Sequence, residues 1–150
     1  GTYLECQDFW RISGIERDVF IMAEPKVKIS DFWAKTSMKN NFKDGVLNLE
    51  IGIGNGTKKN KDITVVTELY HTNGKRIVLK TEKIIIAPNI ISNHNLKKIV
   101  SNVKPWTAET PNLYKIQITL KDNEKVITSI VDEIGFRIIE VHNGQLLVNG

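Results

Sequence analysis

The chain carries many carboxylates, 17 in all, and paired carboxylates can break a bond by acid–base or nucleophilic chemistry. The candidates are Glu68 and Glu82, which we expect to face solvent, and Asp132 and Glu133, which precede a Gly-Phe-Arg turn. None of them stands in a pattern that would aim a nucleophile or shield an acid from water. We therefore predict that the chain contains no catalytic residue.

Other chemistry-bearing patterns are equally weak. The glycines of 52–56 end a predicted strand and precede the lysine-rich run 58–61, not the amphipathic helix that a phosphate-binding loop needs. The histidines are far apart and lack Cys or carboxylate partners at metal-binding spacing: His71, His94 and His142. Cys6 is the single cysteine, which excludes an internal disulfide. We expect no resident cofactor or metal held by these side chains.

The net charge of +4 raises the question of nucleic acid. The lysines are spread along the chain, however, and the two clusters at 58–61 and 97–98 have no aromatic residues between them to stack bases. We predict solvated lysines that protect sheet edges, and no nucleic-acid partner. No apolar run approaches the ~18 residues of a membrane span. The chain starts at Gly1 without a Met, so the missing signal peptide leaves the compartment open.

Alternating apolar and polar residues predict β-strands. Residues 113–121 place their inward apolar side chains at even positions, 46–54 place theirs at odd positions, and 63–70 are rich in β-branched residues. Turn signals separate these runs at 44–45, 73–74, 122–123 and 143–144. We predict about seven strands, at 26–38, 45–54, 62–71, 76–87, 94–103, 113–121 and 124–137, with a short hairpin at 140–150. This pattern predicts an all-β, immunoglobulin-like Greek-key sandwich without a disulfide.

Three separated motifs carry a family resemblance. The first is residues 3–19, with Gln7-Asp8-Phe9-Trp10-Arg11 at its centre. The second is Pro-Trp-Thr-Ala-Glu-Thr-Pro-Asn-Leu-Tyr at 105–114, and the third is Glu-Ile-Gly-Phe-Arg at 133–137, followed by Leu-Val-Asn-Gly at 147–150. In this order and spacing the whole chain resembles part of a glycoside hydrolase family 2 β-galactosidase.

The resemblance implies a domain division. Residues 1–24 correspond to the end of a sugar-binding jelly-roll domain, 25–138 to the immunoglobulin-like sandwich, and 139–150 to a hairpin that leads into the catalytic (β/α)₈ barrel. The acid/base and nucleophile glutamates and the magnesium ligands of the family lie in that barrel, beyond Gly150. The expected partners are the two flanking domains, a β-galactoside substrate and further copies in a homo-oligomer, of a cytoplasmic or periplasmic bacterial enzyme.

The resemblance also assigns roles to individual residues. Asp8 corresponds to an aspartate that binds the galactosyl unit and a sodium ion in the complete enzyme; in the isolated fragment an exposed acid is the better interpretation. We expect Trp106 to plug a corner of the sandwich, and Arg137 to find a carboxylate partner in the barrel or in the preceding loop. The expected domain-interface residues are Trp10, Arg11, Trp106, Phe136 and Arg137.

Two alternatives stay open at this point. The first is another family 2 specificity, β-glucuronidase or β-mannosidase. The sequence of residues 7–14 is more similar to that of the galactosidases, because glucuronidases tend to carry an Asn-Tyr-Ala-Gly form there. The second is a free-standing carbohydrate-binding or adhesion module. Such a module needs an exposed aromatic platform on a sheet face, and the three tryptophans are scattered in sequence.

Overall fold

The structure is a computed structural model that describes residues 14–15, 17–71 and 73–150. Its described part contains strands and turns and no helix. The strands are β1 (Val27–Lys39), β2 (Asp44–Asn55), β3 (Lys61–Tyr70), β4 (Arg76–Ile86), β5 (Ile90–Val100), β6 (Tyr114–Asp122), β7 (Lys125–Ile134), β8 (Ile139–His142) and β9 (Gln145–Val148). The all-β class predicted from the sequence is confirmed, and so are the seven main strands.

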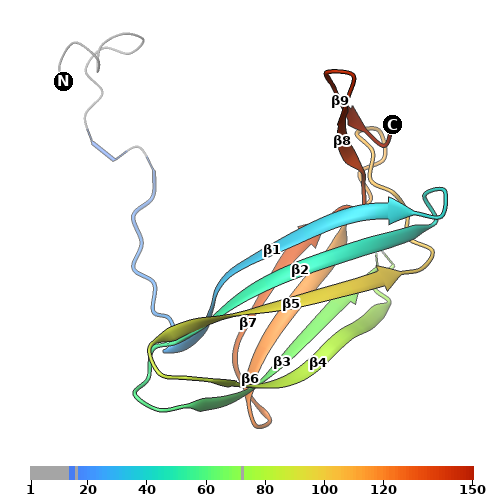
Figure 1. Ribbon diagram of the computed structural model, residues 1–150. Helices are drawn as coiled ribbons and strands as arrows, with labels where there is room; N and C mark the ends of the chain where they lie inside the picture. Colours follow the sequence, from blue (N-terminus) through green and yellow to red (C-terminus); the bar gives the residue numbers. More distant parts are fainter. Residues whose placement is uncertain (1–13, 16, 72) are drawn as a thin grey trace.

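The strands form two antiparallel sheets that face each other as a β-sandwich (Figure 1). One sheet has the order β1-β2-β5 and the other β4-β3-β6-β7, so the chain crosses between sheets after β2, β4 and β5. Relative to a constant-type immunoglobulin domain, the fourth strand pairs with the third instead of joining the sheet of the first, second and fifth. The strands β8 and β9 pair only with each other, as a hairpin that projects from the sandwich.

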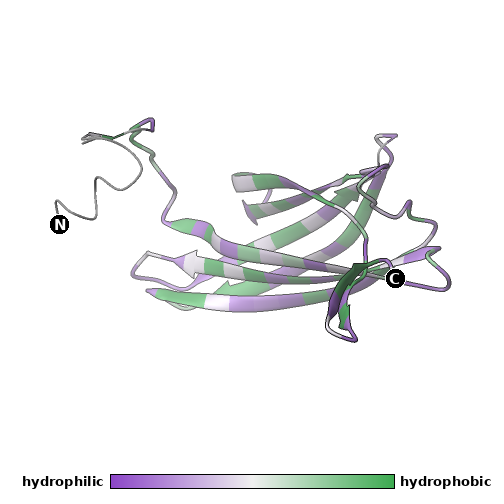
Figure 2. Cartoon of the chain, turned by 90° about the horizontal axis from the view of Figure 1, so that it is seen from above, coloured by the Kyte–Doolittle hydropathy of each residue, from purple (hydrophilic) through white to green (hydrophobic). Residues whose placement is uncertain are grey.

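The core lies between the sheets and is made by alternate residues of each strand. Along the strands, hydrophobic and hydrophilic residues follow one another in bands (Figure 2). The central strands β2, β3 and β6 bury the most, with Leu47, Ile53, Leu69 and Leu120 fully enclosed. The alternation that predicted these strands therefore also gives their inward faces correctly.

An aromatic pair closes the core at the end from which the hairpin leaves. Phe136 lies edge-to-face on Tyr114, with ring centroids 5.2 Å apart, and both side chains are fully buried. A Cβ on Gly45 would lie 2.4 Å from the Phe136 ring. The ring of Phe136 thus occupies the space that glycine leaves at the start of β2.

The turns rely on asparagine in the left-handed region, which this residue tolerates better than most. Among the described residues, those with positive φ that are not glycine are all Asn except Phe42. At the tip of the β8–β9 hairpin, Asn143 and Gly144 have φ values of 49° and 75°, as the sequence predicts for this turn. The prediction of a strand from residue 94 is wrong at its start: Asn89 turns the chain at φ 55°, and Ile90 already pairs with Asn55.

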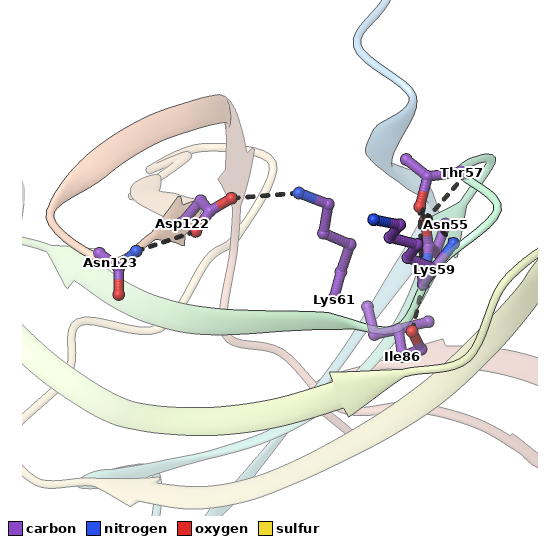
Figure 3. Close-up of polar contacts among 7 residues, drawn as sticks. All are labelled: Asn55, Thr57, Lys59, Lys61, Ile86, Asp122 and Asn123. Carbon is purple, nitrogen blue, oxygen red and sulfur yellow. Dashed lines mark hydrogen bonds and ion pairs between the residues drawn. The ribbon is translucent and has the colours of Figure 1, made fainter.

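The loop that joins β2 to β3 is closed by the buried side chain of Asn55 (Figure 3). Its amide donates to the carbonyls of Lys59 and Ile86, both at 2.9 Å, and its Oδ1 accepts from Thr57 Oγ1 at 2.7 Å. Lys61 then forms an ion pair with Asp122 at 3.4 Å. The hydrogen bonds of the buried Asn55 side chain and the Lys61–Asp122 ion pair therefore hold the lysine-rich loop in place.

The segment before β1 is exposed throughout the residues described between 14 and 26. It contains the apolar run Val19, Phe20, Ile21 and Met22, which are between 69% and 102% exposed. This segment leaves the sandwich at the end opposite the hairpin (Figure 1).

Candidate domain-interface site

The connection between β5 and β6 forms a compact corner around Trp106. Trp106 bridges Pro111 across a tight loop, in which Thr107 N donates to Thr110 O at 3.2 Å and Thr110 N to Thr107 Oγ1 at 2.9 Å. The prolines at both ends of this stretch keep it out of a regular ladder. The loop therefore holds the indole at a fixed place over the sandwich edge.

Trp106 is packed against the segment that follows β7. A Cβ on Gly135 would lie 2.8 Å from three atoms of the Trp106 side chain, and Trp106 N donates to Phe136 O at 2.8 Å. Gly135 O in turn accepts from Thr36 Oγ1 at 2.7 Å. The three segments are thus joined at one point, and Trp106 has the corner position that the sequence predicts.

The guanidinium of Arg137 lies 4.4 Å from the centroid of the Trp106 ring. This is the geometry of a cation–π contact. Arg137 forms no ion pair with any residue that the structure describes. The carboxylate partner expected for Arg137 is therefore not found in the described chain, and a partner in the barrel stays a prediction.

Asn149 fastens the hairpin to this corner. Its backbone N–H donates to Ile138 O at 2.9 Å, its Oδ1 accepts from Ile138 N at 2.9 Å, and its Nδ2 donates to Trp106 O at 2.9 Å. One side chain therefore links the base of the hairpin to the Trp106 loop. The sequence motif 147–150 contained this residue, but its role could not be recognised without the contact partner.

A cleft of about 380 Å³ lies beside the corner, between the edges of β1 and β7. Aromatic and apolar side chains line it together with Arg137, Asp132 and Glu133. Aromatic residues and Arg are enriched where protein surfaces meet. The cleft therefore has the composition of a contact surface for another domain.

The structure places the expected interface residues in different environments. Trp106 and Arg137 are half-buried and border the cleft. Phe136 is 0% exposed, so its side chain belongs to the core of this domain and cannot contact a neighbour directly; here the prediction is wrong. Trp10 and Arg11 lie outside the described residues, as do Asp8 and Cys6.

The acidic residues do not form a catalytic pair in the described chain. Glu68 was expected to face solvent, but it is only 6% exposed, and it forms an ion pair with the Arg76 guanidinium. The hydrogen bond that Arg76 Nε donates to this carboxylate, and then the negative charge of the carboxylate, raise the pKa of Arg76. Glu82 pairs with Lys80 at 2.7 Å on the surface. Both contacts are structural ion pairs.

Metal-binding side chains are also not assembled. Among the residues that the structure describes, no three His, Cys, Asp or Glu side chains come together. His71 packs on Tyr114, with centroids 5.2 Å apart. A sodium site at Asp8 falls outside the described residues and is left as a prediction. Within the described ranges no helix has the length and apolarity for crossing a bilayer.

Sequence reasoning missed an exposed tryptophan. Trp33 is 60% exposed on the outer face of β1, where its neighbours in register are Glu50 and Asn95. The scatter of the tryptophans in sequence did not indicate that one of them, Trp33, stands exposed on a sheet face. The alternation of inward and outward residues along β1 was the sequence signal that could have placed Trp33 on the outer face.

Sequence comparison finds relatives that are much longer than this chain. It is 33% identical over 152 residues to a β-galactosidase of Priestia megaterium, which covers 100% of this chain and 15% of that protein. It is 36% identical over 143 residues to a β-galactosidase of Clostridium acetobutylicum, covering 94% of this chain and 15% of that protein. The chain thus spans about 15% of the length of these relatives.

Structure comparison finds the same sandwich in larger enzymes. A β-glucuronidase of Parabacteroides merdae superposes with a TM-score of 0.67 at 22% identity, covering 84% of this chain and 15% of that one. A calcium-binding mutant of β-glucuronidase 2 from Bacteroides uniformis reaches a TM-score of 0.75 at 15% identity, covering 85% and 16%. These likenesses show the fold. The family model of the glycosyl hydrolases family 2 matches residues 27–137, and together with the relatives above this shows that the chain belongs to that family and is a fragment of one of its proteins.

Proposed function

We propose that this chain is the non-catalytic sandwich domain of a retaining β-galactosidase that hydrolyses terminal β-galactosides. The observation that carries the proposal is the identity of 33% and 36% to two β-galactosidases over nearly all of the chain. The bond-breaking carboxylates then belong to a barrel that follows the β8–β9 hairpin in the complete protein. The described acids fit this assignment, because Glu68 and Glu82 are engaged in ion pairs.

The role of the sandwich in this proposal is that of a rigid spacer. The segment that enters β1 and the hairpin that follows β7 leave from opposite ends (Figure 1). The 13 residues of β1 correspond to about 40 Å at the usual rise of a strand. Neighbouring domains attached at these ends are held far apart and at a fixed angle.

Two surfaces supply contacts for the neighbours. At the first end, the apolar run 19–22 is exposed and needs a partner surface to bury it. At the other end, the cleft with Trp106 and Arg137 receives the domain that the hairpin leads to. In the complete enzyme we further assign Asp8 to galactosyl and sodium binding, magnesium to the barrel, and the sandwich to contacts between subunits of a homo-oligomer.

The test is hydrolysis by the full-length protein that contains this chain. We expect turnover of nitrophenyl β-galactoside with retention of the anomeric configuration, followed by NMR, and far slower turnover of the β-glucuronide and β-mannoside. The 150-residue chain alone should give no hydrolysis above a buffer blank. Turnover by the chain alone that survives Asp8→Ala would overturn the assignment of chemistry to the barrel.

A second candidate is another specificity within the family. The solved structures named above are β-glucuronidases, and their identity to this chain is too low to carry a substrate. The same three substrates separate the candidates: preferential turnover of the glucuronide or mannoside would replace the galactosidase proposal.

A further inference from the structure

The outer face of the sheet β1-β2-β5 contains a groove that the proposed function does not use. Its volume is about 890 Å³, which is within the usual range of small-molecule sites. It lies on the side of the sheet that faces away from the core, and residues of all three strands line it. Its side chains stand in three rows across the sheet: Asp31, Gly52 and Asn93; Trp33, Glu50 and Asn95; Lys35, Asn48 and Lys97.

Trp33 forms the wall of the groove on the β1 side and also borders the cleft toward β7. The Lys35 ammonium lies 3.4 Å from the centroid of the Trp33 ring and 3.0 Å from Glu50 Oε1. Lys35 thus lies over one face of the indole, and 60% of Trp33 is exposed, so the opposite face of the ring is the one that a ligand can contact. A rigid, exposed indole is a platform on which the C–H face of a sugar ring packs.

Gly52 forms the floor of the groove next to this wall. Glycine in a strand interior costs about 0.5–1 kcal/mol relative to Ala, so its presence calls for a reason. A Cβ at Gly52 would meet its nearest atom, Asn93 Oδ1, at 3.4 Å, which is an ordinary contact. The packing of this domain therefore does not require a glycine here. Gly52 is buried, and a side chain at this position would project into the hollow between Asn93 and Ile91.

Three side-chain amides face the groove: those of Asn48, Asn93 and Asn95. None of them makes a side-chain hydrogen bond to a residue in the described part of the chain, whereas the amides of Asn55 and Asn149 are fully engaged. An amide offers a donor and an acceptor side by side. This pairing matches the hydroxyl groups of a sugar, each of which both donates and accepts.

The charges of the groove cancel. Its ionisable residues are Asp31, Glu50, Lys35 and Lys97, two of each sign, although the whole chain carries +4. A nucleic acid or another polyanion requires an excess of positive charge. The balance favours an uncharged ligand.

We propose that this groove binds a neutral oligosaccharide, with Trp33 as the stacking platform and the three amides as hydroxyl partners. Along β1, the distance from Asp31 to Lys35 is about 13 Å at the usual rise of a strand. This length exceeds that of one sugar ring. The site adjoins the cleft at the hairpin corner, because Trp33 borders both. The inference is independent of the proposed function, because it needs no catalytic domain.

The test follows the backbone amides and the Trp33 indole N–H of the ¹⁵N-labelled 150-residue chain by NMR during titration. The probes are galactose, lactose, a β-1,4-linked galactotetraose and a single-stranded oligonucleotide. We expect saturable shifts of β1, β2 and β5 signals with the tetraose, which binds more tightly than galactose. The variants Trp33→Ala and Gly52→Val should each weaken binding at least about tenfold, and Val131→Ala, on the other sheet, should leave it unchanged.

Three results would overturn the proposal: no shift with the tetraose at tens of millimolar, shifts confined to other strands, or an affinity of Trp33→Ala and Gly52→Val that equals that of the wild type. Binding of the oligonucleotide, with no chemical-shift change in the saccharide titrations, would overturn the proposal as well. If Trp33→Ala does not fold, Gly52→Val decides alone, because a β-branched residue favours the strand while it fills the hollow. Hydrolysis by the full-length protein is measured separately, so failure here leaves the galactosidase proposal standing.

Discussion

Trp106 packs directly on Gly135: a Cβ at Gly135 would lie 2.8 Å from Cβ, Cγ and Cδ1 of the tryptophan. The contact joins two motifs that are far apart in sequence. It places the loop that precedes β6 on the segment that follows β7, at the point where the hairpin leaves the sandwich. The close approach requires a residue without a side chain.

The first prediction concerns this contact. Gly135→Ala forces Trp106 away from the backbone, and overpacking of this kind typically costs about 1–3 kcal/mol. We expect the free energy of unfolding, measured by guanidinium titration, to fall by that amount. The matched control is Gly52→Ala, where the nearest atom would be 3.4 Å away and stability should hold or rise slightly. Equal effects of the two variants would contradict the role of the contact.

The second prediction concerns Asn149 and the hairpin. Asn149→Ala removes the hydrogen bonds to Ile138 N and Trp106 O, which together contribute about 1–3 kcal/mol. Since β8 is exposed along its length, the loss should be local. Hydrogen exchange of the Ile138 amide should accelerate at least about tenfold, while the main melting transition stays almost unchanged.

Gln145→Ala serves as the control for this experiment, because Gln145 is an exposed residue of the same hairpin. It should leave the exchange rate of Ile138 as it is. If the Ile138 amide exchanges at the same rate in Asn149→Ala and in Gln145→Ala, the side chain of Asn149 does not fasten the hairpin.

The third prediction separates a shielded ion pair from an exposed one. The side chain of Glu68 is 8% exposed and that of Arg76 59%, so Arg76→Ala leaves a largely buried carboxylate without its cation. Lys80 and Glu82 are 41% and 38% exposed, and such surface pairs contribute little. Arg76→Ala should therefore lower the melting temperature clearly more than Lys80→Ala.

The pH dependence of this pair follows from the raised pKa of Arg76, whose first cause is the hydrogen bond to Glu68. A base whose pKa is higher in the folded state stabilises the fold below its unfolded pKa, and the effect is lost as pH rises through the folded value. That loss lies beyond the ordinary alkaline range. The difference in melting temperature between wild type and Arg76→Ala should therefore be constant between about pH 6 and 9.

The sequence predicted the parts of the fold that depend on local pattern. Alternation is a property of single strands, so β2, β3 and β6 and their buried faces follow from it. The ion pair of Glu68 is formed with Arg76 of the next strand, and the burial of Phe136 depends on the space over Gly45. Such facts arise from pairing between strands, which a single sequence does not display.

The candidate site was predictable to a similar extent. The motifs located Trp106 and Arg137 at the sandwich end, because both lie next to breaks in the strand pattern. The link through Asn149 and the groove around Trp33 need the register of neighbouring strands. Alternation alone places Trp33 outward, but it cannot say that Gly52 and Asn95 stand beside it.

The last prediction concerns Asn55, the buried polar residue at the end of β2. Its Nδ2 faces three carbonyl oxygens, those of Lys59, Ile86 and Ala87, at 2.9, 2.9 and 3.2 Å. Asn55→Asp replaces this donor by an acceptor, so lone pairs meet at close range in a site that is 1% exposed. Asn55→Ala removes both the donor and the acceptor, at a cost of about 1–3 kcal/mol for the partners left without a hydrogen bond.

We therefore expect Asn55→Asp to unfold at lower denaturant than Asn55→Ala, although aspartate is the closer match in shape. At acidic pH the aspartate takes up a proton and can donate again, so the gap between the two variants should narrow. Asn60→Asp, on the exposed part of the same loop, controls for the added charge and should leave the midpoint nearly unchanged. If Asn55→Asp were as stable as wild type at neutral pH, the amide would not be the donor that closes the loop.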